Sequence, residues 1–325
     1  MIAPLILFLF SIFSPAAWAA IDLVDDAGQK LKLAQPPKRI VSLAPHVTEL
    51  VFAVGAGAQL VGADSASDYP QTAQALPRIG DYSRVNFERI AALKPDLIIA
   101  WASGNRPADL HTLRRMGIPI LVTEAHRLAD VSRLLRLIGR ASAHSEAGEA
   151  AAQAFEQRLR TLKTRYAQRK PLRVFYQVWE RPLMTVGGQH WISDALALCG
   201  GRNVFADLHA ASPTVSLEAV LARAPEVIVS GSDGPDSRPM WQRFPRLPAV
   251  RRGAFVRIDA DTLHRPTPRL LDGATALCEA ISRYEPSPQP SDGTTNHSTR
   301  QARDASQVAG YPASGRGSKR DAQTD

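Results

Sequence analysis

The chain has 325 residues, of which 45% are hydrophobic and 22% charged, a composition typical of a globular protein long enough for two domains. Its formal net charge of +8 is high enough to suggest nucleic acid or a membrane surface as a partner. However, the lysines and arginines are scattered, with no run of five and no nucleic-acid-binding motif. We therefore do not expect the chain to bind nucleic acid.

The first 19 residues are predicted to be a cleavable signal peptide. They are almost entirely apolar and end in Ala17-Trp18-Ala19, which fits a small-residue cleavage site, although no lysine or arginine precedes the apolar stretch. The alternative is a membrane anchor, for which the stretch is short. No cysteine lies near the cleavage site, so we expect the mature protein to be exported and free in solution.

The order of strands and helices predicts an α/β fold with two similar lobes. A strand, a loop, a helix, a glycine-rich stop and a short apolar segment follow Pro37, and the same order follows Pro171. Strands that alternate with helices at this spacing indicate βαβ units and parallel sheets. We expect the lobes to span residues 20–144 and 171–284. The glycines of the first copy follow its helix, so they do not indicate a dinucleotide-binding motif.

One stretch occurs twice, 218 − 88 = 130 positions apart. "NFERIAALKPDLIIA" begins at Asn86, and "SLEAVLARAPEVIVS" begins at Ser216. In each copy the first residue is suited to capping a helix, and a glutamate two positions later (Glu88, Glu218) suits the positive end of the helix dipole. A proline and an acidic residue then precede an apolar run. The pattern predicts a capped helix that leads into a buried strand.

A single helix is expected to join the lobes over residues 145–170, because this segment is rich in helix-forming residues and contains no proline. A single helical connector is stiff, so we do not expect large hinge closure. After Tyr284, residues 285–325 are rich in Ser, Pro, Gly, Asp and Arg with few apolar side chains, which predicts a disordered tail.

The chain has two cysteines, Cys199 and Cys278. In an exported protein they would lie in an oxidising compartment, where a disulfide between them is favoured and two separate buried thiols are the alternative.

No common catalytic motif is present: the sequence contains no G-x-S-x-G, no P-loop and no H-E-x-x-H. We therefore do not expect an enzyme. His46, His126, His190, His209 and His264 fall in or near predicted loops, where three of them could meet at a zinc ion. Because no two have a tight ligand spacing, we expect no metal site. A secreted metal-dependent enzyme is the least favoured alternative.

Aromatic residues in loops indicate a binding site for a large, partly apolar ligand. Tyr69, Tyr82 and Trp101 follow strand ends in polar loops, and Trp179 and Trp191 occupy the second lobe as core or as ligand contacts. Ligands of open parallel sheets bind beyond the carboxyl ends of the strands, and flat aromatic walls suit a ligand with a polar rim.

The segments "RIVSLAPHVTELVFAVGAGAQLVGADSASDYP", "RIGDYSRVNFERIAALKPDLIIAW" and "MTVGGQHWISDALALCGGRNVF" carry a family resemblance. With "VSLEAVLARAPEVIV", they resemble the cobalamin-binding periplasmic proteins of bacterial vitamin importers. Those proteins belong to a wider family of helix-linked substrate-binding proteins that also serve ferric siderophores and haem. The resemblance extends from about Arg39 to Tyr284. It implies a ligand cleft between the lobes, and cobalamin or another corrinoid bound as a transported ligand rather than as a cofactor. A ferric siderophore or haem is the alternative ligand.

The resemblance also implies roles for individual residues. Tyr69, Tyr82 and Trp101 match aromatic residues that line the corrinoid cleft, and Arg265 matches a polar contact. Met184 stands where the family can have an aromatic residue, and Ser212 stands where it can have a tryptophan, so this chain departs from the pattern at both positions.

Glu88 and Glu218 match two surface glutamates that dock onto arginines of the membrane permease. The implied partners are an inner-membrane ABC permease dimer and its ATPase subunits, met in the periplasm by a monomeric binding protein.

Overall fold

A computed structural model describes residues 20–167 and 169–284 of the chain. The expected signal peptide (residues 1–19) and the expected disordered tail (residues 285–325) lie outside the described residues. None of the described helices is both long enough and apolar enough to cross a membrane.

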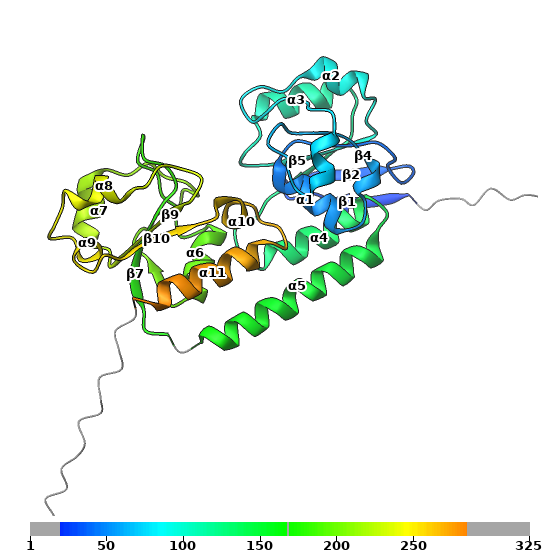
Figure 1. Cartoon of the computed structure of the whole chain (residues 1–325). Helices are drawn as coiled ribbons and strands as arrows, with labels where there is room; N and C mark the ends of the chain where they lie inside the picture. Colours follow the sequence, from blue (N-terminus) through cyan, green and yellow to red (C-terminus); the bar gives the residue numbers. More distant parts are fainter. Residues whose placement is uncertain (1–19, 168, 285–325) are drawn as a thin grey trace, which may run out of the picture. The chain divides into compact units, whose positions relative to one another are not determined.

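The first lobe is a four-stranded parallel sheet with helices on both faces (Figure 1). The strand order is β4-β3-β5-β6. Apolar strand residues are buried on both sides, which explains the continuous apolar runs of the sequence. The elements are β3 (Ile40–Ser42), α1 (Pro45–Ala53), β4 (Leu60–Ala63), α2 (Phe87–Ala92), β5 (Leu97–Trp101), α3 (Pro107–Arg115), β6 (Ile120–Thr123) and α4 (Asp130–Ala141), with short 3-10 turns at Gly57–Gln59 and Gln71–Ala75.

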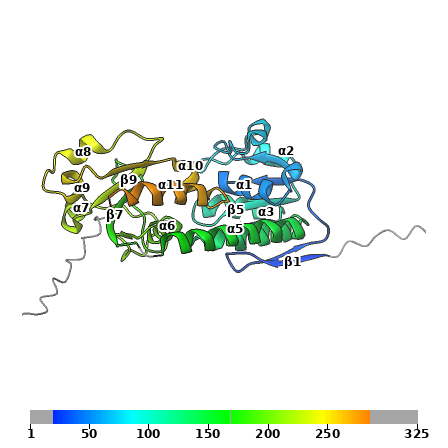
Figure 2. The ribbon, with the colours of Figure 1, turned by 60° about the horizontal axis from the view of Figure 1, so that its bottom comes forward.

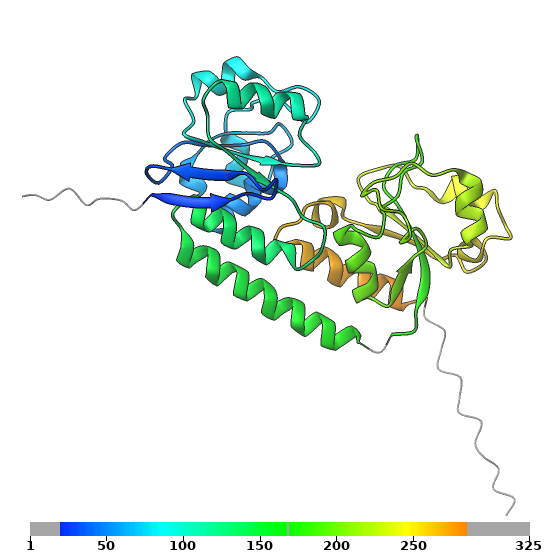
Figure 3. The same cartoon turned by 180° about the vertical axis from the view of Figure 1, so that it is seen from behind.

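A hairpin that the sequence analysis did not anticipate precedes the first lobe. It consists of β1 (Ile21–Val24) and β2 (Lys30–Leu33), which pair antiparallel and lie near α4 (Figure 3). Leu31 and Leu33 are buried while Lys30 and Lys32 are exposed, so the alternation in "KLKL" marks a strand with one face on the protein.

The second lobe repeats this topology: its strand order, β8-β7-β9-β10, corresponds strand for strand to that of the first. The predicted α/β fold with two similar lobes is therefore confirmed. The elements are β7 (Leu172–Gln177), α6 (Trp191–Leu198), β8 (Gly201–Asn203), α7 (Leu217–Arg223), β9 (Val227–Gly231), α8 (Arg238–Gln242), α9 (Pro248–Arg251), β10 (Phe255–Ile258), α10 (Ala260–His264) and α11 (Leu270–Ser282).

A disulfide joins Cys199 to Cys278, as expected, so the alternative of two separate thiols is wrong. It links the carboxyl end of α6 to α11, two helices of the second lobe.

The connecting helix α5 (Ser145–Tyr166) ends four residues before the expected Lys170. It runs beside α4 of the first lobe and reaches α11 of the second (Figure 2). Close approach to α4 requires glycine, because a Cβ atom on Gly148 would lie 2.8 Å from the Leu135 carbonyl oxygen. At the other end, Arg165 forms an ion pair with Glu279 of α11 at 3.7 Å. Both lobes are thus packed on one helix.

The apolar core is continuous between the lobes on the side of α5. One cluster of buried side chains includes Leu97 of β5, Leu135 of α4, Phe155 of α5, Val174 of β7 and Leu277 of α11. The opposite face of each sheet has a separate cluster, one under α2 and α3 and one under α7 to α9.

The repeated stretch forms the same local structure in both lobes. The Asn86 side chain accepts a hydrogen bond from the Arg89 amide at 2.9 Å, and the Ser216 hydroxyl accepts one from the Ala219 amide at 3.1 Å. These are the helix caps that the sequence predicts. The acidic residue after the proline has an unforeseen role. Asp96 accepts the amides of Lys38 and Arg39, and Glu226 accepts the amide of Arg173, so each holds the start of the first strand of its lobe.

Candidate ligand-binding site between the lobes

A cavity of about 330 Å³ is lined by residues of both lobes. The first lobe contributes residues that end or follow β5 and β6, and the second contributes residues after β7, at the start of α6 and at the end of α10. This is the position where ligands of open parallel sheets bind. The lining residues are Trp101, Ser103, Glu124, Ala125, His126, Val178, Val186, His190, Trp191, Ile192, Ala211, Ser212 and His264.

Trp101 forms a fixed aromatic wall of this cavity. Its indole Nε1 donates a hydrogen bond to Glu124 at 3.1 Å, and its backbone amide donates to the Asn105 side chain at 2.7 Å. Gly104 is required beneath the ring, because a Cβ atom there would lie 1.8 Å from the indole. The indole is therefore held by Glu124, which follows β6, and by Gly104 of its own loop, and this spares a ligand the entropy cost of ordering it.

His46, at the start of α1, packs against the ring of Trp101. The two rings meet edge to face, with centroids 5.0 Å apart and an interplanar angle of 88°. Burial, with a smaller contribution from the positive charge of Arg265, lowers the pKa of His46 to about 3. The imidazole is therefore neutral at physiological pH and acts as a packing residue.

The second lobe provides a histidine-rich wall. The His190 ring lies 4.0 Å from that of Trp191 and accepts the amide hydrogen bond of Ile192 at 3.1 Å. Trp191 donates from Nε1 to the Leu263 carbonyl at 2.8 Å, and His264 hydrogen-bonds the Tyr176 hydroxyl at 3.0 Å. Burial lowers the pKa of His190 to about 3 and also lowers that of His264. Two neutral imidazoles and one buried indole thus face the cavity.

Within residues 20–167 and 169–284, no group of three or more His, Cys, Asp or Glu side chains is placed to hold a metal ion. His46 packs against Trp101, and His190 and His264 are engaged as described above. Three of the five histidines that the sequence places near loops therefore have individual structural contacts.

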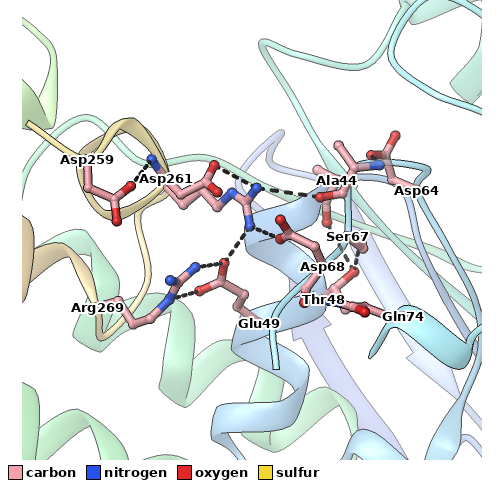
Figure 4. A network of polar contacts seen from close by, with 12 residues as sticks. Ala44, Thr48, Glu49, Asp64, Ser67, Asp68, Gln74, Asp259, Asp261 and Arg269 are labelled. Atoms are coloured by element: carbon pink, nitrogen blue, oxygen red, sulfur yellow. Dashed lines mark hydrogen bonds and ion pairs between the residues drawn. The ribbon is translucent and has the colours of Figure 1, made fainter. Parts of the chain in front are cut away.

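A cluster of charged side chains connects the lobes beside α1 (Figure 4). Glu49 of α1 is buried, with 3% of its side chain exposed, and it accepts two hydrogen bonds from Arg269, at 2.6 and 3.0 Å. Arg265 contacts Glu49 at 3.0 Å, Asp68 at 2.5 Å and Asp261 at 2.7 Å. Burial alone would raise the pKa of Asp68, but hydrogen bonding and the charge of Arg265 hold it below its ordinary value. The cluster ties α1 and the following loop to the α10–α11 segment.

Of the six predicted ligand contacts, Trp101 and Ser212 line the cavity. Arg265 lies in the charged cluster instead. Tyr69 has 45% of its surface exposed, and the guanidinium of Arg269 lies 3.8 Å from the centre of its ring, a cation–π contact. Tyr69 is thus held beside the cluster.

The other two predicted contacts are not among the lining residues. Tyr82 is 76% exposed on the loop between Gly80 and Val85. Met184 is half-buried in a segment that pairs by single bridges with Trp179 and with Thr214.

Two carboxylates that organise the site were not predicted from the sequence. Glu124 holds Trp101, and the signal was a charged residue directly after the buried strand β6. Glu49 holds two arginines, and the signal was an acidic side chain within a largely apolar helix, "HVTELVFA". A charge in such a helix is rarely buried unless it is paired.

Two packed α/β lobes, a connecting helix and an aromatic cavity between the lobes define a substrate-binding protein of the helix-linked type. The sequence profile of the periplasmic binding protein family matches residues 40–262, and the chain belongs to that family.

Among curated relatives, the vitamin B12-binding protein of Vibrio cholerae is 41% identical over 244 residues, which cover 75% of this chain and 88% of that protein. The crystal structure of the periplasmic vitamin B12-binding protein BtuF of Vibrio cholerae is similar with a TM-score of 0.71 and 40% identity, and covers 77% of this chain and 98% of that chain. The periplasmic haem-binding protein RhuT of Roseiflexus sp. RS-1 is similar with a TM-score of 0.69 and 26% identity. The match covers 76% of this chain and 98% of that chain.

Proposed function

We propose that this chain is a periplasmic binding protein that captures cobalamin or a related corrinoid and delivers it to an ABC importer in the inner membrane. The observation that supports this most is the fixed Trp101 wall of the cavity between the lobes, in a chain 41% identical to a vitamin B12-binding protein. The ligand is cargo rather than a cofactor, and the protein does no chemistry on it.

The charge and shape of the site suit a flat, amide-fringed ligand. A corrinoid is larger than a 330 Å³ cavity, so one edge would enter it against Trp101 while the rest lies in the open cleft. The amide groups at the corrin periphery both donate and accept hydrogen bonds. Arg265 offers donors to them, and Asp68 and Asp261 offer acceptors. Tyr69 and Tyr82 would add aromatic contacts above the cavity, and Ser212 and Met184 would complete the second-lobe side.

Haem or a ferric siderophore is the second candidate, and one observation favours it. Three histidines, His126, His190 and His264, line the cavity, and the haem-binding relative RhuT shares the fold at 26% identity. Neutral imidazole is a good ligand for iron.

Spectroscopy separates these ligands. The protein is incubated with cyanocobalamin or with haemin, desalted, and examined by absorbance. We expect a stoichiometric corrinoid spectrum to co-elute and the haem spectrum not to. A haem Soret band that shifts on binding, with no corrinoid retained, would contradict the proposal and favour the second candidate.

We further propose that Glu88 and Glu218 dock the loaded protein onto the permease dimer. Both side chains are exposed in the first turn of corresponding helices, α2 and α7, and neither forms an ion pair with another described residue. One carboxylate on each lobe would meet one arginine on each permease half, above the ATPase subunits. The binding protein itself would remain monomeric in the periplasm.

The double substitution E88A/E218A tests the docking role. Ligand affinity and melting temperature should stay near those of the unaltered protein, while salt-sensitive association with the permease and most transport should be lost. Loss of stability with uptake retained would show that the glutamates only complement their helix dipoles.

A further inference from the structure

A second, larger hollow of about 750 Å³ lies in the first lobe, away from the ligand cavity. It surrounds the amino-terminal ends of α2 and α3, which lie side by side at one end of that lobe (Figure 1). Glu88, the proposed docking residue, is part of its lining. Four arginines and three carboxylates line it, so its formal charge is 4 − 3 = +1.

Of these four arginines, two have partners among the described residues and two do not. Arg78 donates to the carbonyls of Asp64 and Ser67, and Arg106 donates to the carbonyl of Ser83. The exposed guanidinium groups of Arg84 and Arg89, in contrast, form no hydrogen bond or ion pair with any residue that the structure describes. Glu88 therefore has an unpaired arginine on either side in the sequence: Arg89 follows it directly, and Arg84 precedes it by four positions.

A carboxylate in the same hollow also lacks a donor. Asp109 of α3 is only 8% exposed, and its Oδ2 atom accepts no hydrogen bond from the described residues. Its nearest cation is Arg106, whose Nε atom is 4.0 Å away. A buried carboxylate oxygen without a donor is costly, so the negative charge of Asp109 is poorly compensated within the lobe. The hollow thus offers acceptors and donors together.

The second lobe does not repeat these arginines. At the spacing of 130 positions, Thr214 corresponds to Arg84 and Ala219 corresponds to Arg89. The arginine that α7 does carry, Arg223, is already bound by Asp207 through two hydrogen bonds, at 2.6 and 2.8 Å. The glutamate is duplicated, whereas the unpaired arginines beside it belong to the first lobe alone.

We propose that this hollow receives a permease loop in which a carboxylate stands beside the arginine that meets Glu88. This proposal rests on the docking role proposed above. An isolated arginine approaching Glu88 would be repelled by Arg84 and Arg89, and a neighbouring carboxylate turns that repulsion into attraction. On the second lobe the same loop meets threonine and alanine, so the contact is stronger on the first lobe.

The variant R84T/R89A, which copies the second-lobe residues into the first lobe, tests the charge requirement. Association with the permease–ATPase complex of the same bacterium, held in lipid nanodiscs, is measured at about 50 mM and about 500 mM salt. We expect about tenfold weaker association at low salt and convergence with the unaltered protein at high salt. The matched control is R114T/R115A, which removes two exposed arginines from the other end of α3 and should associate normally.

A second variant identifies the partner group directly. R84K/R89K keeps both charges and presents amines that a carbodiimide couples only to carboxylates. Mass spectrometry should find amide cross-links between the introduced lysines and a permease loop, next to an arginine in that loop. Cross-links only to other parts of the same chain would overturn the proposal.

The outcomes distinguish this proposal from the docking role itself. If R84T/R89A associates as well as or better than the unaltered protein while E88A/E218A does not associate, the glutamates dock and the carboxylate proposal is overturned. If both variants associate normally, docking through this face fails altogether. If inorganic phosphate binds the protein in calorimetry and R84T/R89A abolishes that heat, the hollow is a small-anion site and the proposal is again overturned.

Discussion

The two lobes share the residues that build a sheet and differ in the residues that face outward. At the spacing of 130 positions, Asn86 and Ser216 both cap a helix, and Asp96 and Glu226 both accept amides at the start of a strand. At the same spacing, Trp101 at the end of β5 corresponds to Gly231 at the end of β9. Duplication has thus preserved the interactions that fold each lobe, while the strand ends have diverged into an aromatic wall on one side and a histidine-rich wall on the other.

The charged cluster that joins the lobes provides the largest expected effect. E49A removes the carboxylate that pairs with Arg269 and with Arg265, and leaves partly buried guanidinium groups without it. Breaking a buried pair in this way costs about 3 kcal/mol. We expect urea unfolding to show that loss, in one transition, because the core is continuous between the lobes.

The matched control for E49A is E146A, which removes an exposed glutamate in the first turn of α5 and should cost less than about 1 kcal/mol. Equal effects of the two substitutions would show that the buried cluster adds no stability. Two separate transitions in E49A would show that the cluster, rather than the core, couples the lobes.

The second-largest effect is expected at the aromatic wall, which the first lobe has and the second lobe lacks. W101A removes the indole that Glu124 and Gly104 hold at the cavity, and the corresponding residue of the second lobe cannot replace it. Cyanocobalamin affinity in calorimetry should fall by about 1–3 kcal/mol, the range for a well-packed aromatic anchor. The control is W179A, because Trp179 is 60% exposed in the second lobe and absent from the cavity lining. Unchanged affinity in a folded W101A variant would show that Trp101 is a core residue and not a ligand contact.

Acid should lower the free energy of unfolding of the protein through one buried histidine in each lobe. His46 in the first lobe and His190 in the second each have a pKa of about 3 when folded and about 6.5 when unfolded. Between these values the unfolded state binds more protons, so the free energy of unfolding falls as pH falls from 6.5 toward 3. Each histidine contributes a slope of up to about 1.4 kcal/mol per pH unit between these values.

Urea unfolding at a series of pH values checks this slope. H46Q should make the dependence shallower between pH 6.5 and 4, whereas H111Q, which alters an exposed histidine of α3, should leave it unchanged. An unchanged slope in H46Q would mean that His46 takes up a proton while folded.

Local structure could be predicted from the sequence because it depends on neighbouring residues. The caps at Asn86 and Ser216 and the parallel direction of the strands follow from patterns of neighbouring residues. The partners of Arg265 could not be predicted, because Glu49 is 216 positions away and the sequence carries no distance between them. The position of Trp101 at the cavity followed from its strand end, but the carboxylate that orients it, Glu124, directly follows another strand, β6. The long-range contacts of charged residues therefore could not be predicted from the sequence.

The smallest expected effect compares the two acidic residues that follow the repeated prolines. Asp96 accepts two backbone amides, from Lys38 at 2.7 Å and Arg39 at 2.8 Å, whereas Glu226 accepts one, from Arg173 at 3.0 Å. A hydrogen bond to a partly exposed carboxylate contributes about 1 kcal/mol. We expect D96A to cost about 2 kcal/mol and E226A about 1 kcal/mol, read from urea midpoints at constant slope.

The control for this pair is D22A, which removes an exposed carboxylate that forms an ion pair with Lys32 at 3.8 Å, and should have almost no effect. If E226A is as costly as D96A, the number of amides held at the strand start does not set the stability of a lobe, and the two ion pairs of Glu226 with Arg173 and Arg252 must contribute instead. The double variants E226A/R252A and D96A/R252A decide that point. In D96A/R252A the two losses should simply add. In E226A/R252A the loss of Arg252 should add less, because its ion pair with Glu226 is already gone and only its contact with the Tyr284 carbonyl is still to lose.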